Sequence, residues 1–293
     1  KANYFSWQLE NTWSGGEPGI ALSLTYRNKN FIKGSETFNI NIRGGLQRQR
    51  YNDENGEIRI FPTREFGAEA NIFFPKLILP FNFNTSRKDH QPRTTLTIGY
   101  NYQSRPIYKR NTIILTLGYN WMRNEYVQHI ISIPTVNIVK IDPTPSFEAI
   151  LKQETNQRIK DQYTNHLIFG IDYTYIFTNQ DINSLNDFYY IRGNLQSSGN
   201  LISALNNTSL MKTVDNYHEI FGIRYAQFVR LALDFRYFKY VYKDHQIASR
   251  FMFGLGIPYG NSNDIPFEKS FYAGGSNGMR GWHFRELGPG TFN

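Results

Sequence analysis

The sequence predicts an all-β fold, a transmembrane antiparallel β-barrel, and three observations support this prediction. Apolar and polar residues alternate along most of the chain, which is the pattern of strands with one apolar and one polar face. The alternating stretches are about ten residues long, as strands that cross a membrane require. Tyrosine and tryptophan recur near their ends, where a membrane barrel carries aromatic girdles.

Composition agrees with this class and excludes several others. The 293 residues are 16% aromatic and 40% hydrophobic, and their mean hydropathy is -0.51. No run of 18 apolar residues occurs, so we expect no transmembrane helix. Without cysteine, the chain has no disulfide framework, thiolate metal site or cysteine nucleophile. A polar lumen and long loops would dilute the lipid-facing positions and so explain the low mean hydropathy.

Eleven strands are predicted in order along the chain. Their ranges are 4–12, 20–28, 36–50, 65–74, 94–104, 110–122, 129–140, 165–178, 187–197, 228–241 and 246–259. The clearest apolar sets are Ile20, Leu22, Leu24 and Tyr26; Phe38, Ile40 and Ile42; Leu96, Ile98, Tyr100 and Tyr102; Ile113, Leu115, Leu117, Tyr119 and Trp121; Leu167, Phe169, Ile171, Tyr173, Tyr175 and Phe177; Leu231, Leu233, Phe235 and Tyr237; and Phe251, Phe253, Leu255 and Ile257.

A soluble β-sandwich also alternates, but its strands are shorter, about five or six residues. The charged residues inside the predicted strands favour the barrel. Asp172, Asp234, Arg236 and Arg250 all fall on the polar positions. An arginine facing lipid at mid-depth costs about 2–4 kcal/mol, so we expect these charges to face a lumen.

The connections alternate in length, which predicts the two sides of the membrane. Segments 28–34, 123–128 and 242–245 are short, as periplasmic turns are, and 49–64, 141–165 and 198–227 are long and polar, as extracellular loops are. The long 75–93 segment departs from this rule. Within 141–165, a helix is expected with Ser146 as its N-cap.

Nucleic acid, metals and catalysis are not expected. The net charge is +8, but the basic residues are scattered, and even Arg48-Gln49-Arg50 is too small to track a phosphate backbone. The six histidines share no metal-ligand spacing (His90, His129, His166, His218, His245 and His283). Residues 274–278 read Gly-Gly-Ser-Asn-Gly, a hydrolase pattern, but they lack the strand-turn-helix context that it needs. We therefore predict no enzyme and no cofactor.

The most informative residues lie near the end of the chain. They run from Phe271 to Trp282, Phe-Tyr-Ala-Gly-Gly-Ser-Asn-Gly-Met-Arg-Gly-Trp, and are followed by Leu287-Gly288-Pro289. This segment resembles the sixth extracellular loop of the BamA/TamA superfamily of outer-membrane assembly barrels, also called the bacterial surface antigen family. The sequence of this segment is most similar to the BamA/TamA-like lipoprotein branch, TamL, with BamA itself as the alternative.

The resemblance implies that this loop folds inside the barrel and pairs its arginine with an acid on a later strand. The residues concerned are Gly274, Gly275, Met279, Arg280, Gly281 and Trp282. Their chemistry suits such a role, because glycines give the backbone freedom and a guanidinium offers a fork to carboxylates or carbonyls. An ordinary glycine-rich surface loop is the alternative. The acidic partner would lie beyond Asn293.

The first strand is the second candidate site. Phe5, Trp7 and Leu9 lie on one face of the 4–12 strand. In the family this strand borders a weakly closed seam, and such an edge could template an incoming strand by β-augmentation. The alternative is that the strand simply pairs with its neighbours.

The resemblance also implies the domain organisation and function. Residues 1–293 are expected to be the first eleven of sixteen strands plus the sixth loop (260–293), with periplasmic POTRA domains and the last strands outside the sequence. The implied function is assembly, insertion or translocation of outer-membrane proteins in bacteria; the alternative is a passive porin or transporter. The expected partners are outer-membrane lipid, client β-barrel or surface proteins, and periplasmic or inner-membrane assembly proteins that bind through POTRA domains.

Overall fold

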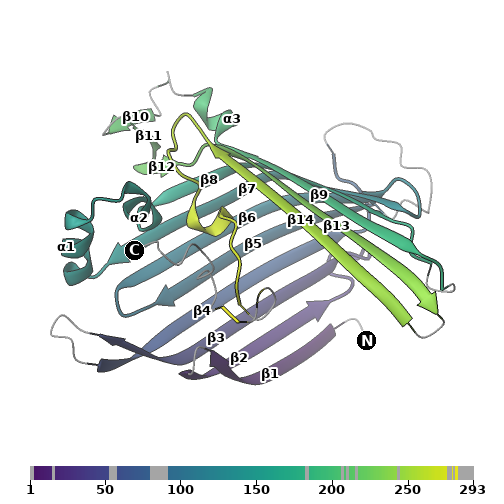
Figure 1. Ribbon diagram of the computed structural model, residues 1–293, viewed down its shortest axis with the longest axis horizontal. Coiled ribbons are helices and arrows are strands. Elements are labelled where there is room, and N and C mark those ends of the chain that lie inside the picture. Colours follow the sequence, from purple (N-terminus) through teal and green to yellow (C-terminus); the bar gives the residue numbers. More distant parts are fainter. Residues whose placement is uncertain are drawn as a thin grey trace.

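A computed structural model gives the fold of the chain (Figure 1). It describes residues 3–14, 17–52, 58–79, 92–181, 185–205, 208, 211–214, 217–242, 245–275, 279 and 281–282. The predicted all-β class is confirmed, with one 14-stranded sheet and a few short helices. None of the helices in these ranges is long and apolar enough to span a membrane.

All eleven predicted strands are present, most of them slightly longer than expected. They are β1 (Asn3–Ser14), β2 (Glu17–Asn28), β3 (Thr37–Asn52), β4 (Ile58–Phe74), β5 (Arg93–Ser104), β6 (Tyr108–Met122), β7 (Val127–Pro143), β8 (His166–Thr178), β9 (Phe188–Ser198), β13 (Phe228–Tyr242) and β14 (His245–Pro258). Consecutive members of this series pair antiparallel, as in an up-and-down barrel wall.

The register separates an apolar face from a polar face. Trp7 pairs with Leu24, which pairs with Ile42, whereas the adjacent Ser23 pairs with Arg43. The apolar face is exposed, and the Trp7 side chain is 68% accessible. A wide exposed apolar face on a curved sheet suits contact with lipid. The predicted position of the strand charges is confirmed, because Asp234 pairs with Arg192 of β9 on the polar face.

Aromatic side chains gather on the apolar face near the 123–126 turn. The His129 ring stacks on Trp121, with 5.1 Å between the ring centroids, and it meets the edge of Tyr175 at 5.7 Å. Its Nδ1 lies 2.9 Å from the Tyr173 hydroxyl. These rings come from three neighbouring strands and lie at one end of the apolar band, where a membrane barrel carries its girdle.

The 198–227 segment contains structure that the sequence did not predict. It forms α3 (Asn200–Ser203), β10 (Met211–Val214), β11 (Tyr217–Ile220) and β12 (Ile223–Tyr225). β12 pairs parallel with the start of β8, where Arg224 lies opposite His166, while β9 joins β8 only from Gly170 onward. These strands are three or four residues long, too short for an alternation signal.

The expected helix in 141–165 is confirmed as α1 (Pro145–Gln153), followed by α2 (Gln157–Gln162). The predicted N-cap is wrong, because Thr144 occupies that position and Ser146 lies in the first turn. The reason is Pro145, whose fixed φ and missing N–H suit the first helical position and set the boundary one residue before it.

Candidate functional site

The chain after β14 turns back and crosses the concave, polar face of the sheet (Figure 1). It contains a short 3-10 helix, η2 (Phe267–Lys269). Two β14 glycines make room for it. A Cβ added to Gly254 would lie 2.6 Å from the Phe271 ring, and one on Gly256 would overlap the Ile265 side chain. Side chains at these two positions would push the loop, residues 259–275, away from the strand.

Buried hydrogen bonds fix the root of this loop. Asn261 Nδ2 donates to the carbonyls of His218 (2.8 Å) and Tyr225 (2.9 Å), and its Oδ1 accepts from the His218 N–H (2.7 Å). Gln227 makes two further hydrogen bonds. Its Oε1 accepts from the Asn261 N–H, and its backbone N–H donates to Ser262 Oγ. The loop is thereby tied to β11 and β12.

A carboxylate between two basic side chains fixes η2. Glu268 Oε1 is ion-paired with Arg110 Nη2 of β6, and Glu268 Oε2 lies 3.1 Å from His166 Nε2 of β8. The three side chains are mostly buried, with 19% of Arg110, 23% of Glu268 and 9% of His166 exposed. Burial raises the pKa of the Glu268 carboxyl, but the hydrogen bond and charge of His166 and the charge of Arg110 outweigh it and lower the pKa to about 2.

Arg230 of β13 binds the same segment from the other side. Its Nε donates to the Lys269 carbonyl at 2.9 Å, and its guanidinium lies 4.0 Å from the centroid of the Phe271 ring. Four strands therefore hold this short segment. β6 and β8 contact Glu268, β13 contacts Lys269 and Phe271, and β14 lies against the Phe271 ring. Contacts from so many strands give this part of the loop one defined position.

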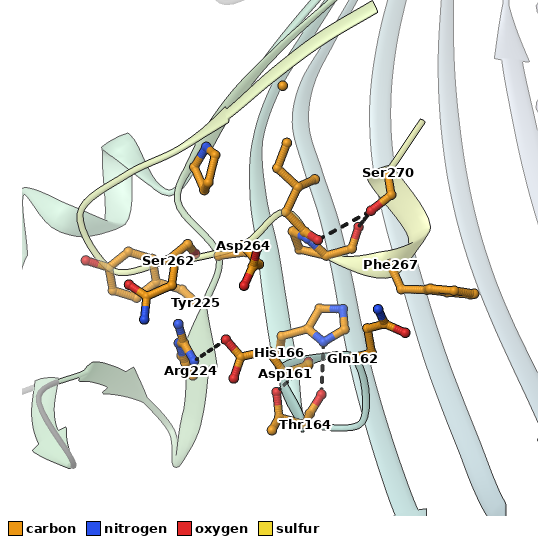
Figure 2. A pocket seen from close by; sticks show the side chains of 16 residues that line it. Asp161, Gln162, Thr164, His166, Arg224, Tyr225, Ser262, Asp264, Phe267 and Ser270 are labelled. Atoms are coloured by element: carbon orange, nitrogen blue, oxygen red, sulfur yellow. Dashed lines mark hydrogen bonds and ion pairs between the residues drawn. The ribbon is translucent and has the colours of Figure 1, made fainter. Parts of the chain in front are cut away.

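A cavity of about 380 Å³ lies beside η2, between α2, β12 and the loop (Figure 2). His166 and Asp264 line it, together with the ion pair of Arg224 Nη1 and Asp161 Oδ2 at 3.6 Å. Ser270 Oγ donates to loop carbonyls. Among the described side chains, no group of three or more His, Cys, Asp or Glu residues is placed to hold a metal ion.

The predicted loop-motif residues are partly described. Gly274 and Gly275 have φ of 96° and 89°, a region that glycine adopts without strain. The Gly275 N–H donates to the Trp282 carbonyl at 2.9 Å, and the Trp282 N–H donates to the Met279 carbonyl at 3.1 Å. Gly281 lies in this turn, and the Met279 and Trp282 side chains are exposed.

Arg280 lies outside the described residues, as do Ser276, Asn277 and Gly278 of the hydrolase-like pattern. The inward position of the Arg280-Gly281-Trp282 motif therefore stays a prediction. Its acidic partner also stays a prediction.

The predicted first-strand residues lie on the apolar face. Phe5, Trp7 and Leu9 pair with Tyr26, Leu24 and Leu22 of β2, and all three are exposed. On its other edge β1 has no partner strand within the described part of the chain. The loop and the first strand are thus separate features, one on the polar face and one at the sheet edge.

Sequence reasoning missed the residues that hold the loop. Glu268 is 158 positions from Arg110 and 102 from His166, so no local pattern links them. A weak signal existed for Arg110 alone, because an arginine on the polar side of a membrane strand must find a partner or water in the lumen. No feature of the sequence pattern indicated a structural role for Asn261.

The family model described as Omp85 superfamily domain matches residues 7–292, which is nearly the whole chain. No curated protein matched the sequence. Superfamily members are outer-membrane assembly or transport factors, in agreement with the predicted BamA/TamA superfamily. An exposed apolar face, a polar concave face and a loop after the eleventh long strand fit that assignment, and the chain belongs to the Omp85 superfamily.

Proposed function

We propose that the chain is the barrel of a factor that inserts or translocates outer-membrane proteins through a lateral seam at β1. The observation that carries this proposal is the match of residues 7–292 to the Omp85 superfamily domain, whose members are assembly or transport factors. β1 is the first strand of the sheet, and its apolar side chains Phe5, Trp7 and Leu9 are exposed. An incoming strand could add to it by β-augmentation while its own apolar side meets lipid.

The loop on the polar face is proposed to brace the barrel during this step. Its anchored part, Ile265 to Phe271, leads directly to Gly274, Gly275 and the Arg280-Gly281-Trp282 motif. A guanidinium near flexible glycines can bind carboxylates or carbonyls of the lumen wall. Arg280→Ala is expected to reduce client assembly and heat resistance, and an unchanged variant would argue against the brace.

The finer assignment is to the TamL branch, and the sequence of residues 271–282 supports it. BamA is the alternative. The 293 residues are proposed to be eleven of sixteen strands plus the sixth loop, in a bacterial outer-membrane protein with POTRA domains. The proposed partners are membrane lipid, client β-barrel or surface proteins and assembly proteins at the POTRA domains. The proposed action needs no catalysis and no cofactor.

Cysteine cross-linking tests the seam. Residues 1–293 contain no cysteine, so a new thiol at position 8 or 97 has no other thiol beside it in this part of the chain. Gln8→Cys places it on the polar face of β1, and Thr97→Cys is a matched control on β5, which is paired on both sides. With a client barrel that carries cysteines in its terminal strand, the full-length protein should cross-link at position 8 and not at 97. Equal cross-linking, or none during active assembly, would refute the seam.

A passive porin is the second candidate, and the polar concave face is the observation that favours it. The loop that crosses this face is evidence against a porin, because it is anchored over the polar surface that would line the pore. A porin would show steady solute conductance that survives deletion of residues 266–290. An assembly factor should instead lose client insertion with that deletion.

A further inference from the structure

His166 is placed with a hydrogen-bond acceptor at each ring nitrogen. Its Nδ1 lies 3.0 Å from the Thr164 carbonyl oxygen, and its Nε2 lies 3.1 Å from Glu268 Oε2. A carbonyl oxygen accepts only, and an ionised carboxylate accepts only. Both contacts are hydrogen bonds only when both ring nitrogens carry a proton, so the geometry suits the imidazolium form.

The carboxylate of Glu268 links three elements. One oxygen meets the Arg110 guanidinium of β6, the other meets His166 at the start of β8, and the carboxylate belongs to η2. Charge-assisted hydrogen bonds are about twice as strong as neutral ones. When His166 is neutral, one ring nitrogen has no proton, and one of its two hydrogen bonds is lost.

The other charged groups around His166 already have partners or lie across the cavity. Asp161 of α2 pairs with Arg224 of β12, and Asp264 of the loop lines the cavity opposite (Figure 2). The neighbour on β7 is the uncharged Val139, which is completely buried. The charge of His166 therefore acts mainly on Glu268, its direct partner.

We propose that Glu268 is the positioning residue of the loop, and that it holds the 265–275 segment through its paired contacts with Arg110 and His166. Because η2 precedes the glycines and the arginine motif, this contact sets where that motif enters the lumen. The measurement of client assembly rests on the proposed function, whereas the measurement of hydrogen exchange does not.

Hydrogen exchange of the full-length protein in lipid tests the contact without any assay of assembly. Amides of 265–275 should exchange several-fold faster in Glu268→Gln than in the wild type at the same pH. His166→Gln, which can keep only one of the two contacts of the His166 ring, should also exchange faster.

His218→Gln is the matched control, because that histidine bonds Thr213 on β10 and does not touch η2. It should exchange like the wild type. The proposal is overturned if Glu268→Gln exchanges like the wild type, or if His218→Gln exchanges as fast as His166→Gln.

A disulfide that replaces the contact tests positioning as such. Ile265 contacts the site of Gly256 on β14, so Gly256→Cys with Ile265→Cys can lock the loop to the strand. Glu268→Gln should lower client assembly several-fold, oxidation of the cysteine pair in that variant should restore it, and reductant should remove the gain. Ile265→Cys alone in the Glu268→Gln variant is the control, because a side chain at Gly256 beside the intact Ile265 would itself displace the loop.

The two arms separate the possible failures. If Glu268→Gln remains defective with the loop locked, the residue does not act by positioning. If the wild type assembles no client, the proposed function fails, and the exchange measurement still decides whether Glu268 and His166 hold the loop.

Discussion

The guanidinium of Arg230 stacks on the ring of Phe271 at 4.0 Å, and that ring occupies the space that a side chain on Gly254 would fill. Neither relationship could form if β14 carried a larger residue here, because a Cβ would lie 2.6 Å from the ring. The strand is therefore shaped to receive the loop. Ile265 and Gly256 repeat the arrangement two residues along the strand.

Gly254→Ala should displace the loop from β14. The added methyl overlaps Phe271, and overpacking costs about 1–3 kcal/mol. The expected result is a lower unfolding temperature and faster hydrogen exchange in residues 265–275. Gly44→Ala on β3 is the control, since no atom lies within 4 Å of the site of its Cβ. Equal effects of the two substitutions would show that the close approach is unimportant.

Asn261→Ala should loosen the root of the loop. Asn261 is 4% exposed, and its removal leaves the His218 and Tyr225 backbone groups without their partner. Each buried unsatisfied group costs about 1–3 kcal/mol. Thermal unfolding of the full-length protein should show the loss.

Asn263→Ala is the control for that measurement. It lies two residues away, is exposed, and makes one side-chain hydrogen bond, to the Tyr217 hydroxyl. Its effect should be small. If Asn263→Ala lowers the unfolding temperature as much as Asn261→Ala, the buried network does not fix the loop.

The sequence predicted the sheet well because its signal is local. Alternation with period two repeats within each strand, and a one-residue slip would turn charges such as Asp172 and Asp234 toward lipid. The short strands β10 to β12 were missed because their position depends on a free stretch of β8 beside His166, which is a tertiary property. The N-cap error at Ser146 arose from one residue, Pro145.

The site was less predictable for a related reason. The glycines at 274 and 275 could be identified from the sequence, and both have a positive φ, but their role in folding the loop inward stays a prediction. The contact of Glu268 with Arg110 and His166 joins three elements far apart in the chain. Such a contact is decided by the curvature of the sheet, which brings β6 and β8 under the loop, and no local pattern encodes it.

Asp234→Asn should weaken the wall formed by β13 and β14. The Asp234 carboxylate accepts two hydrogen bonds from Arg236 and two from Arg250. Without the charge, two guanidinium groups face each other, and hydrogen bonds to charged groups contribute about 1.5–3 kcal/mol each. A lower unfolding temperature is expected. Glu69→Gln is the control, because the exposed Glu69 carboxylate accepts a hydrogen bond from the neutral Asn71 amide, and a similar loss there would contradict the prediction.

Acid should release the loop through Glu268. Its pKa is about 2 in the folded protein, below the usual 4.5, so its contribution to stability is complete above about pH 4.5 and is lost as the pH falls toward 2. The unfolding temperature of the wild type should exceed that of Glu268→Gln at pH 6, and the difference should shrink by pH 3. Glu148→Gln on α1, which removes an exposed pair with Lys152, should show almost no difference at either pH. A gap between wild type and Glu268→Gln that stays constant from pH 6 to pH 3 would mean that the carboxylate charge does not hold the loop.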